Sequence, residues 1–197
     1  MVSCFKGKFK VTSPRGYRTI WGKREYHKGI DLVGVDDKTV YSICDGTVRT
    51  AYQGNGAGYY VVVTMADGRR VFYMHLKAGS FKVETGDKVV KGQALGIMGS
   101  TGASTGAHTH LELRPKGTTG DSLDICEFTG ITNKVGTYIY NEEKPMLETA
   151  NDIVWELNHS YFPITETEKF VKELEEAKKK NASLYWGYYK LVNKIKK

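Results

Sequence analysis

The sequence has few cysteines and no long apolar segment. Its three cysteines, Cys4, Cys44 and Cys126, lie far apart and form no Cys-x-x-Cys pair, so neither a disulfide framework nor a thiolate metal site is indicated. No apolar run approaches the length of a transmembrane helix. The first six residues contain no apolar stretch of the kind found in signal peptides. We therefore expect buried and unreactive thiols, no membrane span and no classical signal peptide.

Acidic residues are outnumbered by basic ones, which gives a formal net charge of +7 and a pI of about 9.1. A basic surface favours polyanions such as nucleic acid, an anionic membrane or an anionic cell wall. The lysines are scattered and no nucleic-acid-binding motif is present, so we do not expect a nucleic-acid partner. The 197 residues, with 40% hydrophobic and 12% aromatic side chains, suffice for one ordinary globular domain and a small second one.

The sequence from about residue 8 to residue 140 is typical of short β-strands. Runs rich in Val, Tyr and Thr are bounded by glycine or Asp-Gly, and both Asp67-Gly68 and Gly54-Asn55-Gly56 predict tight hairpin turns. Strands do not alternate with long helices, so the pattern predicts a mainly β, antiparallel core and not an α/β fold. The expected strands include Thr39–Tyr41, Gly46–Ala51, Tyr59–Met65, Val71–Leu76 and His108–Arg114.

The composition changes after Pro145, where glycine becomes rare and helical signals replace strand signals. Thr149, Thr165 and Ser183 are suitable caps for three helices, and Thr165 with Glu168 forms a capping box. We predict a catalytic domain over residues 1–140, a linker over 141–148 and a small α-helical module over 149–197. The module is near the lower size limit for independent folding.

Four of the five histidines fall into three short motifs. His27 and Asp31 form a His-x-x-x-Asp pair, His75 ends an apolar run, and His108 and His110 form a His-x-His pair. Side chains two residues apart on a strand share a face, and polar rings on an otherwise apolar strand are costly unless something uses them. Three ligands with basic groups nearby are what a catalytic zinc site requires.

The alternative interpretation of the His-x-His pair is a polar strand face whose histidines have no functional role. His159, the fifth histidine, has no partner in sequence, and we expect only a structural role for it. Along the same strand we expect Glu112 on the face of the histidines, and Leu111 and Leu113 towards the core.

In combination, the motifs resemble the lysostaphin and LytM type of peptidoglycan endopeptidases. The resemblance covers about residues 13–114 and is absent from the C-terminal region. Leu111 stands where the family often has Phe, and Tyr59 stands where Asn is usual, which puts loop shape or substrate fit in question. The matching segments are Ser13–Arg18, His27–Leu32, Asp45–Val48, Tyr73–Leu76, Val83–Val89, Lys91–Gln93, Gly99–Gly102, Ser104–Gly106 and His108–His110.

Carried over by position, the resemblance implies that His27, Asp31 and His110 bind one Zn²⁺ per chain. It also implies that His75 and His108 are the catalytic pair, one accepting a proton from the attacking water and one stabilising the oxyanion or protonating the leaving amine. Which residue does which is left open at this point. Two neutral imidazoles and one carboxylate leave such a site at about +1, which keeps zinc a strong Lewis acid.

Other side chains are candidates for supporting roles. Glu112 either orients a zinc ligand from outside the coordination sphere or is a partly exposed strand carboxylate. Tyr17, Trp21 and Tyr26 line a substrate groove or simply pack turns, and Tyr59 is a further candidate for substrate contact.

The resemblance implies a zinc-dependent endopeptidase that hydrolyses peptide cross-links or stem peptides of bacterial peptidoglycan, acting in the cell wall. The C-terminal region resembles phage lysins through Ser183–Lys190, where aromatics alternate with lysines that would bind glycan or an anionic wall polymer. The alternatives are packing within the helical module or a homodimer contact. Without a signal peptide, we expect a phage endolysin that accumulates in the cytoplasm for holin-type release, or a virion-associated lysin. A domain cut from a longer protein would look the same.

Two other classes of function are disfavoured. A binding or regulatory module with an idle site predicts the loss of a ligand, and every ligand position is filled. Glycine turns such as Thr85–Gly92 also occur in lipoyl and phosphocarrier domains, but no lysine in a tight hairpin flanked by hydrophobes is present, and a phosphocarrier has no use for Asp31.

Overall fold

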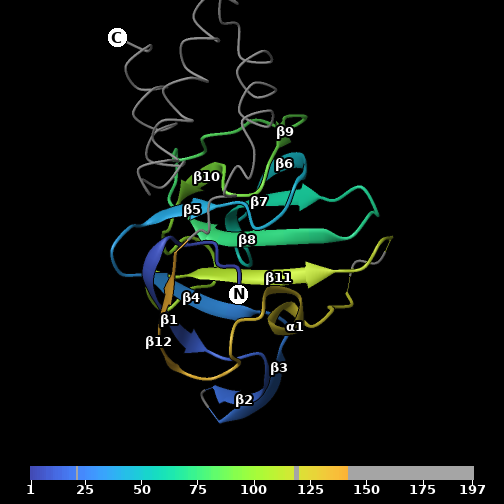
Figure 1. Cartoon of the computed structure of the whole chain (residues 1–197). Helices are drawn as coiled ribbons and strands as arrows, with labels where there is room; N and C mark the ends of the chain where they lie inside the picture. The colour runs from blue at the N-terminus through green and yellow to red at the C-terminus, as the bar shows by residue number, and fades with distance from the viewer. Residues whose placement is uncertain (21, 118–119, 142–197) are drawn as a thin grey trace, which may run out of the picture. The chain divides into compact units, whose positions relative to one another are not determined.

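An eight-stranded antiparallel sheet dominates the described part of the chain (Figure 1). The structure is a computed structural model, and it describes residues 1–20, 22–117 and 120–141. The chain divides into two units, 1–142 and 143–197. The predicted helical module 149–197, and the predicted linker 141–148 apart from its first residue, lie outside the described residues.

The large sheet has the strand order β12-β1-β4-β11-β8-β7-β6-β9, and two small two-stranded sheets pair β10 with β5 and β2 with β3. Every strand pair among the described residues is antiparallel, as predicted. The elements are β1 (Gly7–Ser13), β2 (Gly16–Ile20), β3 (Lys23–His27), β4 (Ile30–Gly34), β5 (Thr39–Tyr41), β6 (Gly46–Gln53), β7 (Gly58–Thr64), β8 (Arg70–Leu76), β9 (Lys88–Val89), β10 (Ala94–Ile97), β11 (Thr109–Arg114), α1 (Ile125–Thr129) and β12 (Gly136–Tyr140).

The two faces of the large sheet have different neighbours. One face carries the main core, to which the strands contribute alternate residues such as Phe9 and Val11, and Leu111 and Leu113. Buried residues of the N-terminal segment, the small β5–β10 sheet and α1 complete that core. The opposite face carries a smaller cluster of Ala57, Val62, Phe72 and Met74. Because the core occupies one face, the central strands can present polar side chains on the other.

The hairpins predicted from the turn residues are present. The chain reverses at Asp67-Gly68 between β7 and β8, where Gly68 has φ +87° and its amide donates to the carbonyl of Met65. Residues 54–57 connect β6 to β7. Glycine is favoured at position 68 because it adopts positive φ without a Cβ clash.

The short helix α1 and several strands were not anticipated. Asp124 caps α1 by accepting from the amides of Cys126 and Glu127, and Gly130 ends it at φ +69°. An Asp followed six residues later by Gly is the only local signal, and five residues are too few for a helical apolar period. The predicted strand from His108 begins one residue later, because the His108 amide pairs with Gly99 instead. No helix in the described ranges is long and apolar enough to cross a membrane.

All three cysteines are free and buried, as expected. Burial raises the pKa of Cys44 and of Cys126 from 9.0 to about 11, and it raises that of Cys4 still further. Only the thiolate reacts with alkylating reagents.

We therefore predict that iodoacetamide modifies these thiols in the folded protein at least about 100-fold more slowly than in the denatured chain, since two pKa units lower the thiolate fraction about a hundredfold. Mass spectrometry of timed samples measures the rates. A cysteine that reacts equally fast in both states would contradict its burial.

Candidate metal centre

The candidate site lies on the sheet face opposite the main core, over the adjacent strands β4, β11 and β8 near the middle of the sheet (Figure 1). His27 ends β3, Asp31 lies in β4, His75 lies in β8, and His110 lies in β11 with His108 just before it. Strands β4, β11 and β8 are neighbours, so Asp31, His75 and His110 meet although the sequence separates them by up to 79 residues.

The alternation of β11 selects which side chains enter the site. Thr109, Leu111 and Leu113 are buried on the core side, so His110 and Glu112 project from the other face. His110 lies directly opposite Asp31 on β4 and Met74 on β8. The face predicted for His110 and Glu112 is the observed one, whereas His108 precedes the strand and lines the same cavity from there.

Three donor atoms converge at the site. His27 Nε2 lies 3.1 Å from Asp31 Oδ1 and 2.9 Å from His110 Nδ1, and His110 Nδ1 lies 2.9 Å from Asp31 Oδ1. Among the described residues this trio is the group of His, Cys, Asp and Glu side chains able to hold a metal ion. His27 and Asp31 are buried, with 4% and 8% of their surfaces exposed.

The other side of each ligand is held by a neighbour. His27 Nδ1 donates to the carbonyl of Pro14 at 2.8 Å, so its Nε2 carries the lone pair that faces the trio. His110 Nε2 lies 3.3 Å from Glu112 Oε2, which leaves His110 Nδ1 as the ligand atom. Two imidazole nitrogens and one carboxylate oxygen aimed at one point fit Zn²⁺, whose catalytic sites use three protein ligands and one open position.

The charges of the site are strongly coupled. Burial would raise the pKa of Asp31, but the adjacent rings of His110 and His27 outweigh burial and hold it well below its usual range. Burial would lower the pKa of His110, but its bonds to Asp31 and Glu112 raise it. Burial likewise opposes ionisation of Glu112, yet His110 and Arg114 lower its pKa to about 2. Both carboxylates are therefore ionised near neutral pH.

Gly29, between His27 and Asp31, is required for space. A Cβ at Gly29 would lie 2.3 Å from the carbonyl oxygen of Leu111 and 2.7 Å from His110 Nε2. Its φ is not in the left-handed region. The sequence suggested that glycine allows a turn here, whereas the structure shows that it lets the ligand ring of His110 approach the backbone.

His75 and His108 lie beside the trio, with their ring centroids 4.7 Å apart. His75 Nδ1 lies 2.8 Å from the carbonyl oxygen of Thr101, and His108 Nδ1 lies 2.8 Å from that of Gly106. Because a carbonyl only accepts, both Nδ1 atoms carry a proton, which leaves Nε2 of each ring as the nitrogen that can accept or release one. His108 Nε2 faces the trio, 3.6 Å from Asp31 Oδ1.

The backbone of His75 is unusual. Its φ is +63°, and it is the one non-glycine residue in the described ranges with positive φ. The β7–β8 register shifts here, with Val61 opposite Tyr73 but Tyr59 opposite Leu76. This bulge turns the imidazole towards the site, and such strained conformations cluster at functional positions. Burial, with the nearby His108 and His110, lowers the pKa of His75 to about 4 despite the Thr101 bond.

A groove crosses the site in two parts. A cavity of about 570 Å³ is lined by the four histidines of the site and by Asp31. Its walls are residues 102–105, with Arg18 and Glu25 of the β2–β3 hairpin. A second cavity of about 510 Å³ lies over Thr12, Ser13, Thr19 and Val33. The two cavities share Arg18, Asp31, Thr105 and His108. An extended peptide is a suitable occupant for a groove of this kind.

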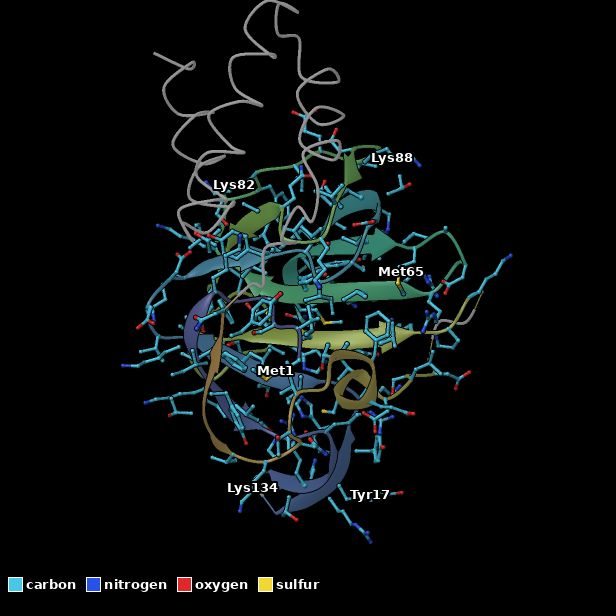
Figure 2. The ribbon with its side chains drawn as sticks, viewed as in Figure 1. Met1, Tyr17, Met65, Lys82, Lys88 and Lys134 are labelled. Carbon is cyan, nitrogen blue, oxygen red and sulfur yellow. The ribbon has the colours of Figure 1, made fainter. Side chains whose placement is uncertain are left out.

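Three of the aromatic candidates for substrate contact, Tyr17, Tyr26 and Tyr59, lie within the described residues. Tyr17 is 70% exposed and points outward from the β2–β3 hairpin (Figure 2), where it packs edge-on against Tyr26 on the paired strand. Tyr59 packs against Tyr52 and Phe81. None of these residues lines either cavity. Trp21 lies outside the described residues, and a substrate role for the four aromatics stays a prediction.

Sequence reasoning missed several contributors to the site. Thr101 and Gly106 contribute backbone carbonyls, which no side-chain pattern reveals. Arg18 reaches Asp31 from the hairpin. It follows Gly16-Tyr17 in a segment that matched the family pattern, but its spacing from Asp31 carries no recognisable signal.

Known proteins are similar to this chain in sequence. The model of peptidase family M23 matches residues 25–122. Over 110 residues the chain is 34% identical to the DD-carboxypeptidase/endopeptidase Mpg of Neisseria meningitidis serogroup B, covering 55% of this chain and 25% of that protein. It is 28% identical to the glycyl-glycine endopeptidase ALE-1 of Staphylococcus capitis, covering 82% of this chain and 51% of ALE-1. The chain thus spans about a quarter to a half of these relatives.

Solved structures give the same result. The catalytic domain of the antimicrobial peptidase lysostaphin from Staphylococcus simulans superposes with a TM-score of 0.53 at 29% identity, covering 61% of this chain and 91% of that domain. The catalytic domain of the prophage-encoded M23 protein EnpA from Enterococcus faecalis, solved as a point mutant, gives a TM-score of 0.51 at 32% identity, covering 58% and 87%. The resemblance to the lysostaphin and LytM type is confirmed.

Proposed function

The chain belongs to peptidase family M23, and from this premise we propose that it is a zinc-dependent endopeptidase of bacterial peptidoglycan. It would hydrolyse peptide cross-links or stem peptides in the cell wall. The observation that carries the proposal is the convergence of His27 Nε2, Asp31 Oδ1 and His110 Nδ1 beside two further imidazoles in a peptide-sized groove.

The metal would be held by His27, Asp31 and His110. When bound, zinc supplies a Lewis acid that polarises the peptide carbonyl and makes water more acidic. Glu112 orients the His110 ring through Nε2, and Arg114 holds Glu112 through a 2.7 Å contact from Nε to Oε1. Carboxylates that bond a ligand imidazole in this way fix its orientation and raise its basicity.

His75 and His108 would move the protons. Each has an Nε2 lone pair because its Nδ1 proton is held by a backbone carbonyl. One ring accepts a proton from the attacking water, whose oxygen becomes part of the new carboxylate. The peptide C–N bond breaks, and the accepted proton passes to the leaving amine. Burial favours the neutral state of His75, so its Nε2 lone pair is available, but the lowered pKa makes this ring a weak base.

Purified sacculi test the proposal. We predict that the zinc-loaded chain releases fragments with new peptide termini, identified by mass spectrometry, and that His110→Ala releases none. Mpg, a DD-carboxypeptidase/endopeptidase by name, is 34% identical to the chain against 28% for ALE-1, so we expect cleavage at D-alanyl cross-links. Walls with glycine bridges test the alternative bond.

Intact cross-links with both proteins, across walls of several compositions, would contradict hydrolysis and would favour a binding module with an idle site. Cleavage by His110→Ala at the wild-type rate would remove the metal trio from the mechanism.

We further propose that the chain is a phage-encoded endolysin or virion-associated lysin. The 32% identity to the prophage-encoded EnpA supports this origin. Proteomics of purified virions and of lysates after prophage induction would detect the chain. Its production only in uninduced cells would contradict the proposal. Residues 149–197 remain the candidate for wall-polymer binding or homodimer formation.

A further inference from the structure

Arg18 links the β2–β3 hairpin to the metal trio. Its Nη1 donates to Asp31 Oδ2 at 3.3 Å and to Ser13 Oγ at 2.8 Å, while its Nε donates to Glu25 Oε1 at 2.7 Å. Three partners fix one guanidinium, which is the arrangement that makes arginine a rigid fork and not a mobile point charge. The side chain is 29% exposed, so it is partly shielded from water.

The two oxygens of Asp31 have different tasks. Oδ1 faces the trio, within 3.1 Å of His27 Nε2 and 2.9 Å of His110 Nδ1. Oδ2 accepts from Arg18, whereas the contacts with these two nitrogens are made by Oδ1. A carboxylate ligand binds a metal through one oxygen or through both. The Arg18 contact occupies the oxygen that would have to rotate inward for two-oxygen binding.

This division of oxygens affects the open position of the site. A second oxygen from Asp31 would fill space that a catalytic zinc needs for water and substrate. The position concerned faces the groove, because Asp31 lines both cavities and Arg18 lies beside it in both. Arg18 and Asp31 therefore mark the boundary where the two parts of the groove meet.

A simple charge-balancing role fits less well. Asp31 already has His27 and His110 as partners for its charge, and Glu25 shares the charge of Arg18 at a shorter distance than Asp31 does. Arg18 instead orients the Asp31 carboxylate, because it bonds Oδ2 and not Oδ1.

We propose that Arg18 is a positioning residue that holds Asp31 in one-oxygen ligation and so keeps the metal's open position free for the reaction. The inference rests on the metal site of the proposed function. It concerns the geometry of ligation, so it is tested without peptidoglycan.

The test uses the full chain loaded with Co²⁺, whose visible spectrum reports coordination geometry in zinc sites. In Arg18→Gln, Oδ2 is released and a second Asp31 oxygen reaches the metal. We expect weaker visible absorption than in the wild type, because higher-coordinate Co²⁺ absorbs less than four-coordinate Co²⁺. Zinc affinity, measured by competition with a chromogenic chelator, should be retained or increased, while kcat on sacculi falls about 10- to 100-fold.

Arg69→Gln is the matched control. Arg69 also has a 2.7 Å contact from Nε to a carboxylate, on Asp67, but it lies in the β7–β8 turn, at the opposite end of β8 from His75. Its removal should leave the cobalt spectrum and kcat unchanged. Glu25→Gln is a second variant that is safe for folding, since the Glu25 side chain is 48% exposed. It loosens Arg18 and should shift the spectrum in the same direction by less.

An Arg18→Gln spectrum equal to the wild type would overturn the inference, as would loss of zinc affinity in Arg18→Gln, because a ligand-orienting role alone predicts weaker binding. If Arg18→Gln does not fold, an unchanged spectrum in Glu25→Gln overturns it instead. Wild-type protein that takes up no cobalt would overturn the metal site itself, and the inference with it. If the cobalt spectra of the wild type and of Arg18→Gln differ as expected but the wild type cleaves no sacculi, the result would count against the proposed substrate only.

Discussion

His27→Ala is expected to lower hydrolysis of sacculi at least about a thousandfold and to remove stoichiometric zinc from the protein. A zinc site with two ligands and an extra open position binds its metal poorly, and the loss of Lewis-acid catalysis and of the oriented water costs several kcal/mol in the transition state. Elemental analysis of dialysed protein gives the zinc content, and fragment release gives the rate.

The control for this result is reversible metal removal. A chelator should reduce the wild type to the rate of His27→Ala, and added zinc should restore the wild type only. His27 is 4% exposed, so a thermal unfolding curve must show that the variant is folded. A folded His27→Ala protein with full activity and no zinc would exclude metal-dependent hydrolysis.

His75→Asn is expected to keep its zinc and lose about 10²- to 10⁴-fold in kcat, the range for removal of a general acid or base. Asparagine is chosen because it tolerates the left-handed backbone that His75 adopts at φ +63°, whereas most other side chains would add strain there. Zinc content and unfolding temperature should therefore stay close to those of the wild type.

The comparison of His75→Asn with His27→Ala separates the two roles. Loss of zinc in His75→Asn would place His75 among the ligands, and unchanged kcat would remove it from proton transfer. His108→Ala provides a further comparison, because its ring lies 4.7 Å from His75 and has the same Nδ1 arrangement. If His75 and His108 act together to move a single proton from the water to the leaving amine, the double variant with both substitutions should be little slower than either single variant.

Much of the fold was predictable because its signals are local. Strand propensity and turn glycines indicated β5, β6, β7, β8 and β11 within one or two residues, and alternation on β11 indicated that Leu111 faces the core and His110 faces the other side. The short elements were missed, since the two residues of β9 or the five of α1 contain too little pattern to recognise. The C-terminal helices stay a prediction.

The motifs, through the family resemblance, also indicated His27, Asp31, His75, His108 and His110 as the site, and the structure brings these side chains together. By itself, therefore, the sequence determined the antiparallel β class, the peptidase family and the set of chemical groups. Each of these depends on residue types and on spacings within short segments.

Only the tertiary structure decided how those groups are arranged. The register of β4 against β11 places Asp31 opposite His110, a bulge gives His75 its positive φ, and Arg18 reaches one oxygen of Asp31. It also placed Tyr17 and Tyr59 outside the groove. These features depend on strand pairing between residues far apart in the chain, and pairing is set by burial of the whole sheet face, which no local pattern encodes.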